Sequence, residues 1–471
     1  MFRKEMLRLN EKIVPFLICA RDPNRQLLCH RLLILFITFL VYTTYHTSRK
    51  PMSVVKSKLY LNETSTENWY PFEGHNGRSL LSLLDAVYWG SYAIFMFITG
   101  FLCERSDLRL FLSISLTLCG ILCIMQGFAF TFNIHSLSYF VVMQLLNGAM
   151  QTTGWPTVIA IVGGWFSDSK RGLIFGIWNF HTSLGNILGL TIAGIFVDYN
   201  WGLSFQVPGF LCILVGLIVF LFVVPRPSDI GIHLNRLSKS NLYDIDKSKN
   251  EENKLLSKKR QDAISFWNAL RIPGVIEYSV CLAFTKSVSY IFLNWLPKFL
   301  EESFSMEPSE SAYISIMFEI GGMIGSIVAG LLADRTEASG LVCIVFLALA
   351  IPSLFIFNKF SSISMTMNFI LQLITGFFVN GPYSLITTAV SADLAEKVPS
   401  KNAMATVSAI IDGTGSIGAA LGPAITGPLT DLFGWQGVFY LSMLADLIAI
   451  LCLVRIGLEE MRKIFLLSPS R

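Results

Sequence analysis

Two adjacent cations at the end of an apolar run are the first residues whose types could do chemistry. Arg49 and Lys50 stand side by side in "VYTTYHTSRKPMSVVK". Either the pair marks the outer end of a membrane helix, or it holds an anion, because guanidinium binds phosphate oxygens bidentately and ammonium adds a point charge. Outer flanks of membrane helices are poor in Lys and Arg, yet Lys56 and Lys58 follow here, which favours the second interpretation.

A third cation, Lys286, lies near the middle of the apolar run "CLAFTKSVSYIFLNWLP". A lysine at a helix centre costs roughly 2.5–3.5 kcal/mol on insertion scales and therefore needs a reason. It forms a structural ion pair with Glu319 or Asp412, or it faces a water-lined substrate site. Arg49 and Lys286, facing each other across a dry cavity, would suit a dianion such as a phosphate ester.

Acidic and aromatic residues within the apolar runs supply further candidates. Glu319 and Asp412 could each neutralise Lys286 between substrates or carry a proton, and both roles stay open. Asp85 is expected in the first turns of its helix, where the helix dipole favours a carboxylate, and a structural role is expected for it. Packing is the alternative to a binding role for the aromatic residues that could line the site. These are Tyr42, Tyr45, Tyr88, Tyr290 and Trp295.

Composition identifies the chain as a membrane protein with many spans. Of 471 residues, 53% are hydrophobic and 14% charged, and the mean hydropathy is +0.57, whereas soluble proteins are nearer a quarter charged. The net charge of +4 is small and dispersed, so no nucleic-acid partner is expected. Nine scattered cysteines without a C-x-x-C pattern indicate neither a disulfide framework nor a metal site. No nucleophile–base constellation is visible, so the chain is not expected to be an enzyme or to need a cofactor.

Twelve apolar runs of membrane-spanning length predict an all-α membrane protein. Six precede and six follow a long polar stretch that contains "DIDKSKNEENKLLSKKR". The runs start near His30, Leu80, Leu110, Leu137, Gly172, Leu203, Val275, Ser311, Gly340, Ser364, Ala403 and Trp435. The predicted divisions are a tail at 1–29, a six-helix half at 30–225, a linker at 226–267, a second half at 268–457 and a tail at 458–471.

Lys and Arg in the short loops orient the chain in the bilayer. The basic N-terminus, the linker and the C-terminal end fall on one side, so both termini and the linker are predicted to be cytoplasmic. Asn62 begins the sequon Asn62-Glu63-Thr64 in the long first loop, on the predicted non-cytoplasmic side. It is a candidate glycosylation site, with a chance match as the alternative.

The two halves repeat one another. "GFLCER" at Gly100 recurs as "GLLADR" at Gly330, and "NG" at Asn147 recurs at Asn380. A longer stretch near Ser183 recurs near Ser416, with Asp198 and Asp431 in matching places. Three ordered matches at nearly constant offset indicate duplicated halves. Two related six-helix halves joined by a linker describe the major facilitator architecture, in which the halves rock around a central site.

The first of these repeats carries candidates for conformational gating. "GFLCERSDLR" resembles the major facilitator loop motif G-x-L-x-D-R-x-x-x-R, with Glu104 in the acidic place and with Arg105 and Arg109 as its arginines. The second copy keeps Asp334 and Arg335 but lacks the last arginine. Such residues can form a charge cluster that one conformation keeps and another breaks. A positive-inside loop is the alternative.

A more specific resemblance comes from four separated motifs. "RGLIFGIWNFHTSLGN" resembles the R-G-x5-W-N signature of the organophosphate:phosphate antiporters. "RKPMSVVK", "WNFHTSLGN", "KSVSYIFLNWLP" and "AIIDGTGSIGAALGP" are similar to the eukaryotic sugar-phosphate exchangers, solute carrier family 37. The resemblance implies exchange of a sugar phosphate, glucose 6-phosphate or a similar ester, for inorganic phosphate by alternating access. It also implies residence in the endoplasmic reticulum membrane.

The resemblance also assigns residues. Arg49 matches the family's substrate-binding arginine, Lys50 completes its Arg-Lys pair, and Lys286 takes the matching place on helix seven. His181 falls one place before the bacterial signature's histidine, where Thr182 stands, so either is a candidate ligand and helix packing is the alternative.

Two other functional hypotheses remain open. One is a proton-coupled transporter of another small organic anion or a neutral solute, with Glu319 or Asp412 as proton carrier. The other is a membrane sensor that kept the fold without transporting. The sequence leaves the preferred ester and the oligomeric state open.

Overall fold

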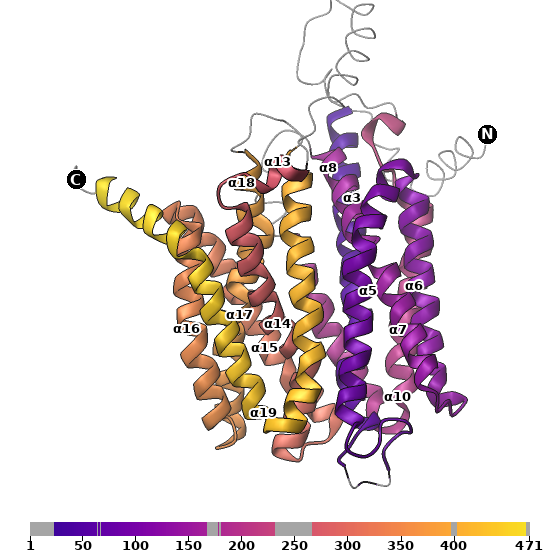
Figure 1. Cartoon of the computed structure of the whole chain (residues 1–471). Helices are drawn as coiled ribbons and strands as arrows, with labels where there is room; N and C mark the ends of the chain where they lie inside the picture. The colour runs from indigo at the N-terminus through magenta and orange to yellow at the C-terminus, as the bar shows by residue number, and fades with distance from the viewer. Residues whose placement is uncertain are drawn as a thin grey trace, which may run out of the picture.

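The computed structural model describes residues 23–63, 65, 67–166, 178, 180–230, 266–396 and 403–467 (Figure 1). The predicted N-terminal tail up to residue 22, the centre of the predicted linker (231–265) and most of the antiporter signature (167–177 and 179) lie outside these residues. All regular secondary structure in the described residues is helical, which confirms the predicted all-α class.

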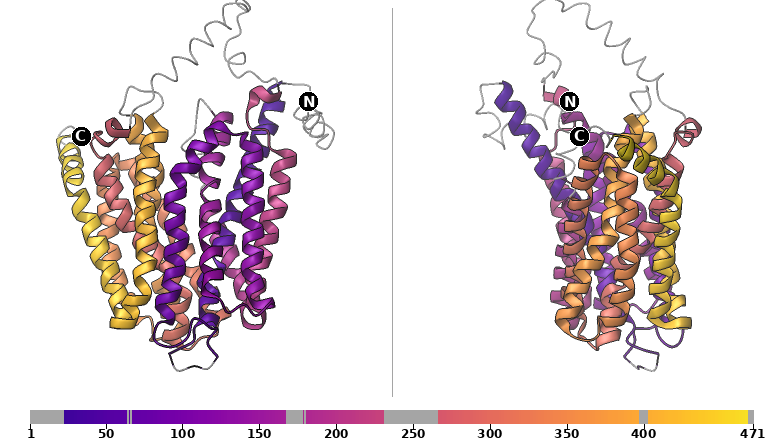
Figure 2. Two further views of the ribbon diagram at one scale, coloured as in Figure 1. Left: turned by 45° about the vertical axis from the view of Figure 1, so that its right-hand side comes forward. Right: turned by 90° about the vertical axis from the view of Figure 1, so that its left-hand side faces the viewer.

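The helices divide into an N-terminal and a C-terminal bundle that stand side by side (Figures 1 and 2). The N-terminal bundle consists of α3 (Pro23–Arg49), α4 (Pro51–Leu59), α5 (Gly77–Arg105), α6 (Leu108–Thr131), α7 (Leu137–Gln151), α8 (Gly154–Trp165) and α10 (His181–Phe222). The C-terminal bundle consists of α14 (Val275–Phe304), α15 (Pro308–Thr336), α16 (Ser339–Phe360), α17 (Met365–Leu385), the π-helix η2 (Ile386–Val390), α18 (Ser391–Glu396) and α19 (Ala403–Leu467). Two short elements lie between the bundles in sequence, η1 (Pro227–Ile230) and α13 (Phe266–Leu270).

The described chain crosses the membrane twelve times, as predicted. Nine helical spans in its described part are long and apolar enough to do so. Two of the nine, α10 and α19, each contain two helices joined at a non-helical residue, Asn200 and Gly434 respectively. The consecutive helices α7 and α8 add one more crossing. Gly434 has a φ of +65°, a conformation that glycine adopts without strain.

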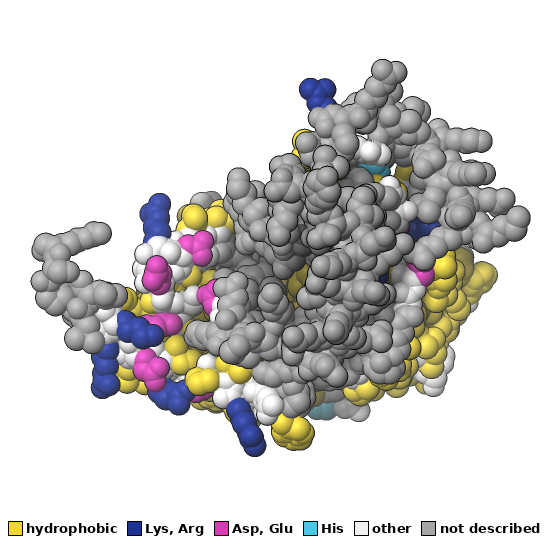
Figure 3. All heavy atoms as spheres, turned by 90° about the horizontal axis from the view of Figure 1, so that it is seen from above, with side chains coloured by type: hydrophobic (Ala, Val, Ile, Leu, Met, Phe, Trp, Pro, Cys, Tyr) yellow, Lys and Arg dark blue, Asp and Glu magenta, His cyan; other side chains and the backbone are white. Residues whose placement is uncertain are grey.

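Both described ends of the chain lie at one end of the bundles, and residues 60–76 lie at the other (Figures 1 and 2). We call these ends the terminal face and the loop face. Charged side chains of described residues show on the terminal face, and apolar side chains show at its rim (Figure 3). Large apolar side chains within the membrane spans, such as those of Phe36, Ile94 and Leu451, are exposed. Since α19 continues as helix to Leu467, it extends into the predicted C-terminal tail.

The hydrophobic cores show where the bundles meet. Three clusters contain side chains of one bundle only, one within residues 27–230 and two within residues 269–456. A fourth cluster combines N-terminal residues near the loop face, such as Val54 and Val55, with Trp295 and Ala312 of the C-terminal bundle. A fifth, smaller cluster packs Trp89 of α5 against Tyr290 of α14. The bundles therefore share packing on the loop side and at the level of these aromatic residues, and have separate cores elsewhere.

Within the C-terminal bundle, glycines bring α15 and α17 into backbone contact. A Cβ added at Gly325 would lie 2.0 Å from the carbonyl oxygen of Phe377, and one at Gly376 would lie 2.1 Å from that of Phe318. Small residues that allow such approach are typical of membrane helix interfaces. On the same helix as Gly325, a Cβ at Gly330 would meet no atom within 4 Å.

We therefore expect Gly325→Ala to destabilise the protein and Gly330→Ala to leave it unchanged or slightly stabilised, because alanine is the better helix former. Overpacking against backbone costs about 1–3 kcal/mol or more. The measurement is the melting temperature of the purified proteins in detergent. Equal melting temperatures for the two variants would contradict the close approach of α15 and α17.

Candidate substrate site at the bundle interface

Arg49 lies within the first membrane span and not at its end. It is the last residue of α3, and after a break at Lys50 the chain continues as α4, so one span runs from Arg25 to Leu59. Pro51 is the first residue of α4, a position where its missing N–H costs nothing. The first helix thus continues beyond the pair of cations, which rules out the helix-end interpretation.

The guanidinium of Arg49 is held by an amide and by aromatic rings. Its Nε donates to Oε1 of Gln151 at 2.9 Å, and its Cζ lies 5.8 Å and 5.4 Å from the ring centres of Trp89 and Tyr92. Its Nη2 is buried and has no hydrogen-bond partner among the described residues. The described chain also gives Arg49 no carboxylate partner. An uncompensated positive charge with a free donor is therefore present at mid-span.

Lys286, in the opposite bundle, is paired. Its Nζ lies 2.9 Å from Oδ1 of Asp412 and 3.4 Å from Oγ of Ser416, and it lies 5.6 Å and 5.8 Å from the ring centres of Tyr290 and Tyr383. The Asp412 side chain is 22% exposed, while that of Lys286 is 5% exposed. A partly exposed carboxylate is the easier partner of such a pair to displace or rehydrate.

One aromatic cluster separates the two cations. Trp89 and Tyr92 contact Arg49 from the N-terminal bundle, Tyr290 and Tyr383 contact Lys286, and the rings of Trp89 and Tyr290 lie 4.6 Å apart. Beside Arg49 lies a polar cavity of about 10 Å³, which is room for one water at most. In this conformation the space on the loop side of Arg49 is closed to a sugar phosphate.

Lys50 and Lys56 of the first span form buried ion pairs. Lys50 crosses to Glu319 of the opposite bundle at 2.7 Å, and their side chains are 3% and 8% exposed. Asn186 donates to the second oxygen of Glu319 at 2.9 Å. Glu319, considered above as a partner of Lys286, is thus the partner of Lys50 in this structure. The ammonium of Lys50, a candidate substrate ligand, is therefore engaged by Glu319 in this structure.

Lys56 pairs with Asp85, and both are buried. Asp85 lies in the third turn of α5, so it is this lysine that stabilises it, and not the helix dipole invoked above. Lys58 pairs with Asp198 at 3.2 Å near the loop face. The unusual density of cations after Arg49 is therefore explained by carboxylate partners that lie far away in sequence.

Three candidate ligands of the N-terminal bundle point into its own interior. Tyr45 is fully buried and its hydroxyl lies 3.3 Å from that of Thr153. His181 is fully buried with its ring centre 4.5 Å from that of Tyr42, and its Nδ1 lies 3.1 Å from the Thr182 hydroxyl. Tyr290, by contrast, lies in the aromatic cluster between the cations.

The residues predicted to gate the terminal side are only partly described. The side chains of Glu104 and Arg105 lie outside the described residues. Arg109 is buried at the start of α6, and its backbone N–H donates to the capping carboxylate of Asp107. Asp334 and Arg335 are exposed at the end of α15. The predicted gating cluster therefore stays a prediction.

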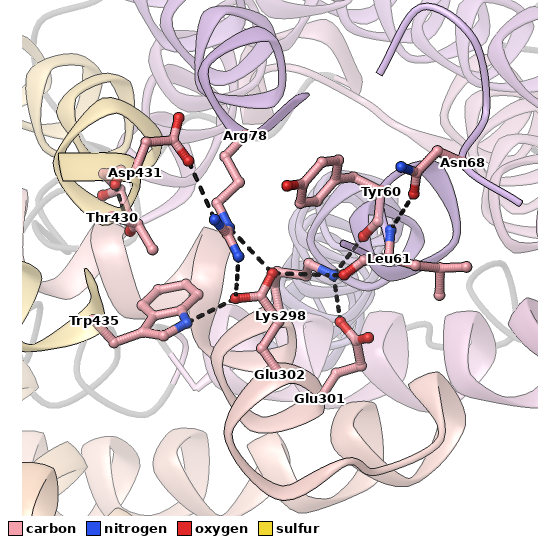
Figure 4. Close-up of polar contacts among 11 residues, drawn as sticks. Tyr60, Leu61, Asn68, Arg78, Lys298, Glu301, Glu302, Thr430, Asp431 and Trp435 are labelled. Carbon is pink, nitrogen blue, oxygen red and sulfur yellow. Dashed lines mark hydrogen bonds and ion pairs between the residues drawn. The ribbon is translucent and has the colours of Figure 1, made fainter. Parts of the chain in front are cut away.

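Near the loop face the bundles are joined by a network that the sequence analysis did not identify (Figure 4). Arg78 of α5 contacts Glu302 at 3.2 Å and Asp431 at 3.3 Å. Lys298 donates to the backbone oxygen of Tyr60 at 2.5 Å and lies 3.3 Å from Glu302. We call these five residues the loop-face network. Only Asp431 had been noted, as a duplicated position.

All hydrogen bonds and ion pairs seen between the bundles, among the described residues, lie at the level of Arg49 or nearer the loop face. They join Lys50 to Leu293 and Glu319, Lys56 and Trp89 to Asn294, Tyr60 and Leu61 to Lys298, Arg78 to Glu302 and Asp431, Ser79 to Asp431, Ser82 to Gly427, and Asn186 to Glu319. The structure is closed on the loop side.

Asp446, a further intramembrane carboxylate, was missed as well. It lies in the last span, is 1% exposed, and its Oδ2 has no hydrogen-bond partner among the described residues. A search for every charge within an apolar run would have found it.

Comparisons with known proteins agree with this architecture. A family model described as the Major Facilitator Superfamily matches residues 32–410. The glucose-6-phosphate exchanger SLC37A2 of Bos taurus is 44% identical, with 92% of this chain and 94% of the relative covered. The glucose-6-phosphate exchanger SLC37A1 of Mus musculus is 39% identical, with 92% and 93% covered. A crystal structure of a bacterial homolog of the human lysosomal transporter Spinster superimposes with a TM-score of 0.66 at 16% identity, over 92% of this chain and 97% of that one.

The loop-face network predicts the effect of Arg78→Ala. Loss of the ion pairs with Glu302 and Asp431 should open the loop side more often, because partly exposed pairs of this kind contribute about 1 kcal/mol each. Ser82 is buried between the bundles, where its hydroxyl accepts the backbone N–H of Gly427 at 2.6 Å. A cysteine at this position therefore reports the opening of the loop side. In a Ser82→Cys background, Arg78→Ala should raise the labelling rate by an impermeant thiol reagent about fivefold or more.

Lys58→Ala is the matched control, since its ion pair with Asp198 lies near the same face but within one bundle. The protein without Ser82→Cys sets the background labelling. An unchanged rate in Arg78→Ala, or an equal rise in Lys58→Ala, would show that the network does not hold the bundles together.

Proposed function

The chain belongs to the major facilitator superfamily and, within it, to the solute carrier 37 family of sugar-phosphate exchangers, and we propose that it exchanges a sugar phosphate for inorganic phosphate through the site between Arg49 and Lys286. The observation that carries the proposal is the uncompensated guanidinium of Arg49 at mid-span, with its buried and unpartnered Nη2. A phosphate group supplies both the missing charge and the missing acceptors.

The paired state of Lys286 completes the site. Its partner Asp412 is partly exposed, so an entering phosphate dianion can compete for the ammonium while the carboxylate is rehydrated. The phosphate would then be held from both bundles, by Arg49 on one side and Lys286 on the other. The tyrosines and Trp89 between them must move apart to admit it. Their polar tips and flat faces are suited to a sugar ring.

This arrangement explains why exchange should be obligatory. When the site is empty and dry, the charge of Arg49 is uncompensated, and closing the bundles around a desolvated charge is costly. A bound phosphate neutralises the site and lowers that cost. Reorientation with substrate is thus favoured over reorientation without it, which couples the entry of one phosphate compound to the exit of another.

The proton-coupled alternative gains no support from the described contacts. Glu319 accepts from both Lys50 and Asn186 in a buried network, so both of its oxygens are engaged. Asp412 accepts from Lys286. A readily protonated carrier would need a carboxylate without a cation partner at the bundle interface.

Exchange can be tested in proteoliposomes preloaded with inorganic phosphate. Uptake of labelled glucose 6-phosphate should require the internal phosphate. Arg49→Ala and Lys286→Ala should each lower it at least about a hundredfold, because a charge-assisted pair buried at the site is lost. Lys58→Ala, which removes a cation from an exposed pair on the first span, should keep it.

Two outcomes would refute the proposal. One is uptake that is driven by a pH gradient alone and is indifferent to internal phosphate. The other is normal exchange by either the Arg49 or the Lys286 variant at equal protein level.

We further propose that the terminal face is cytoplasmic and that the protein resides in the endoplasmic reticulum, with the loop face in the lumen. The positive-inside rule supports this orientation, since the cations found near the loop face are those held in ion pairs with carboxylates. Asn62 is exposed in the loop-face segment, where a lumenal enzyme could glycosylate it.

Asn62→Gln should therefore remove a mobility shift that endoglycosidase H also removes. Asn76→Gln is the control, because Asn76 is exposed in the same loop but begins no sequon. A protein that shows no shift sensitive to the enzyme would contradict the proposed orientation or the use of Asn62.

A further inference from the structure

Two helix breaks meet beside the proposed phosphate site. The first span breaks at Lys50, directly after Arg49. The span formed by α7 and α8 breaks at Thr152 and Thr153, directly after Gln151. Lys50, Thr152 and Thr153 keep right-handed helical φ/ψ, so the helical hydrogen bonding is interrupted at these positions while each span continues. The hydrogen bond from Arg49 to Gln151 joins the two breaks.

Gln151 is itself fixed on both sides of its amide. It is 0% exposed. Its Nε2 donates to Oγ of Ser48 at 2.9 Å and to Sγ of Cys119 at 3.0 Å, and its Oε1 accepts from Nε of Arg49 at 2.9 Å. The reversed amide would place N–H groups against the N–H of the guanidinium. The amide oxygen is therefore directed at Arg49.

This contact decides which edge of the guanidinium is available. The Nε–H is already used, and Trp89 and Tyr92 lie 5.8 Å and 5.4 Å from the Cζ of Arg49. The end that carries the two Nη atoms remains, and its Nη2 is buried without a partner. A phosphate group can then bind end-on through both Nη atoms, the bidentate geometry that guanidinium allows.

We propose that Gln151 is a positioning residue, which occupies Nε of Arg49 and thereby orients the guanidinium for end-on binding of a phosphate group. This inference rests on the proposed exchange function and specifies how its phosphate is recognised. Because phosphate is the part that inorganic phosphate and sugar phosphates share, the contribution of Gln151 is the same for both substrates.

Two substitutions separate positioning from packing. Gln151→Leu removes the acceptor, so the guanidinium can rotate and its Nε is left without a partner. Gln151→Glu is nearly isosteric and keeps the acceptor, but its carboxylate pairs with Arg49 and competes with phosphate. A packing role would make the glutamate variant the milder of the two. A positioning role beside Arg49 makes Gln151→Glu the more harmful of the two variants for phosphate binding.

The experiment measures exchange in proteoliposomes as a function of substrate concentration. Gln151→Leu should raise KM about tenfold, as expected for loss of a hydrogen bond to a charged group, with a maximal rate within about twofold of wild type. The factor by which KM rises should be equal for inorganic phosphate and glucose 6-phosphate. Gln151→Glu should raise KM further while its melting temperature stays at or above the wild-type value.

Gln372→Leu is the matched control, because Gln372 is also 0% exposed but lies in the C-terminal bundle, where it donates to Asn368. It should leave KM unchanged. A wild-type KM in Gln151→Glu, or KM factors that differ between the two substrates, would overturn the positioning role.

Binding of inorganic phosphate to the purified proteins, read as the phosphate-dependent rise in melting temperature, provides a second measurement without transport. It should show the same ranking of wild type, Gln151→Leu and Gln151→Glu. If wild type binds phosphate but does not exchange it, the proposed function fails while the ranking still tests Gln151. If the ranking is absent, the role of Gln151 fails whatever the exchange assay shows.

Discussion

A charge inside a membrane needs a partner, and the rest of the structure depends on how this chain meets that requirement. Lys50, Lys56, Lys286 and Lys298 each have a carboxylate within ion-pair distance. Arg49 has an amide and two aromatic rings instead. A neutral acceptor and ring faces keep the guanidinium in place without cancelling its charge. The proposed site therefore carries a positive charge that can attract an anion.

One of the ion pairs that satisfy the intramembrane charges also joins the two bundles. Lys50 belongs to one bundle and Glu319 to the other, and the loop-face network likewise connects α5 with α14 and α19. The loop side therefore cannot open unless several buried or half-buried pairs separate together. On the terminal side the described cores belong to one bundle each. This asymmetry is what alternating access requires of a conformation closed at one face.

The sequence was sufficient for the fold and for singling out the two cations of the proposed site. Apolar runs of spanning length gave the twelve crossings, and Arg49 and Lys286 stood out because each is a cation within such a run. Glu319 could not be assigned to Lys50, since the two are 269 residues apart in sequence and Lys286 was an equally reasonable partner. Arg78, Lys298 and Glu302 lie near helix ends, where charged residues are ordinary.

The sequence could not identify Gln151 as a site residue, for a different reason. A glutamine near the end of an apolar run has no distinctive signal, and its meaning depends on the break at Thr152 and on its distance to Arg49. Tyr45 shows the reverse case, because as an aromatic residue within an apolar run it was a candidate for lining the site. The structure directs it instead into the interior of its own bundle. The direction in which each side chain leaves its helix, and not its residue type, decides that Gln151 contacts Arg49 and that Tyr45 does not.

The most direct test of the central claim is an experimental structure of the protein with glucose 6-phosphate bound. The account predicts a phosphate group within hydrogen-bond distance of the Nη atoms of Arg49 and of Nζ of Lys286, with Asp412 displaced from the lysine. A phosphate bound elsewhere, or bound while Lys286 keeps its ion pair with Asp412, would contradict it.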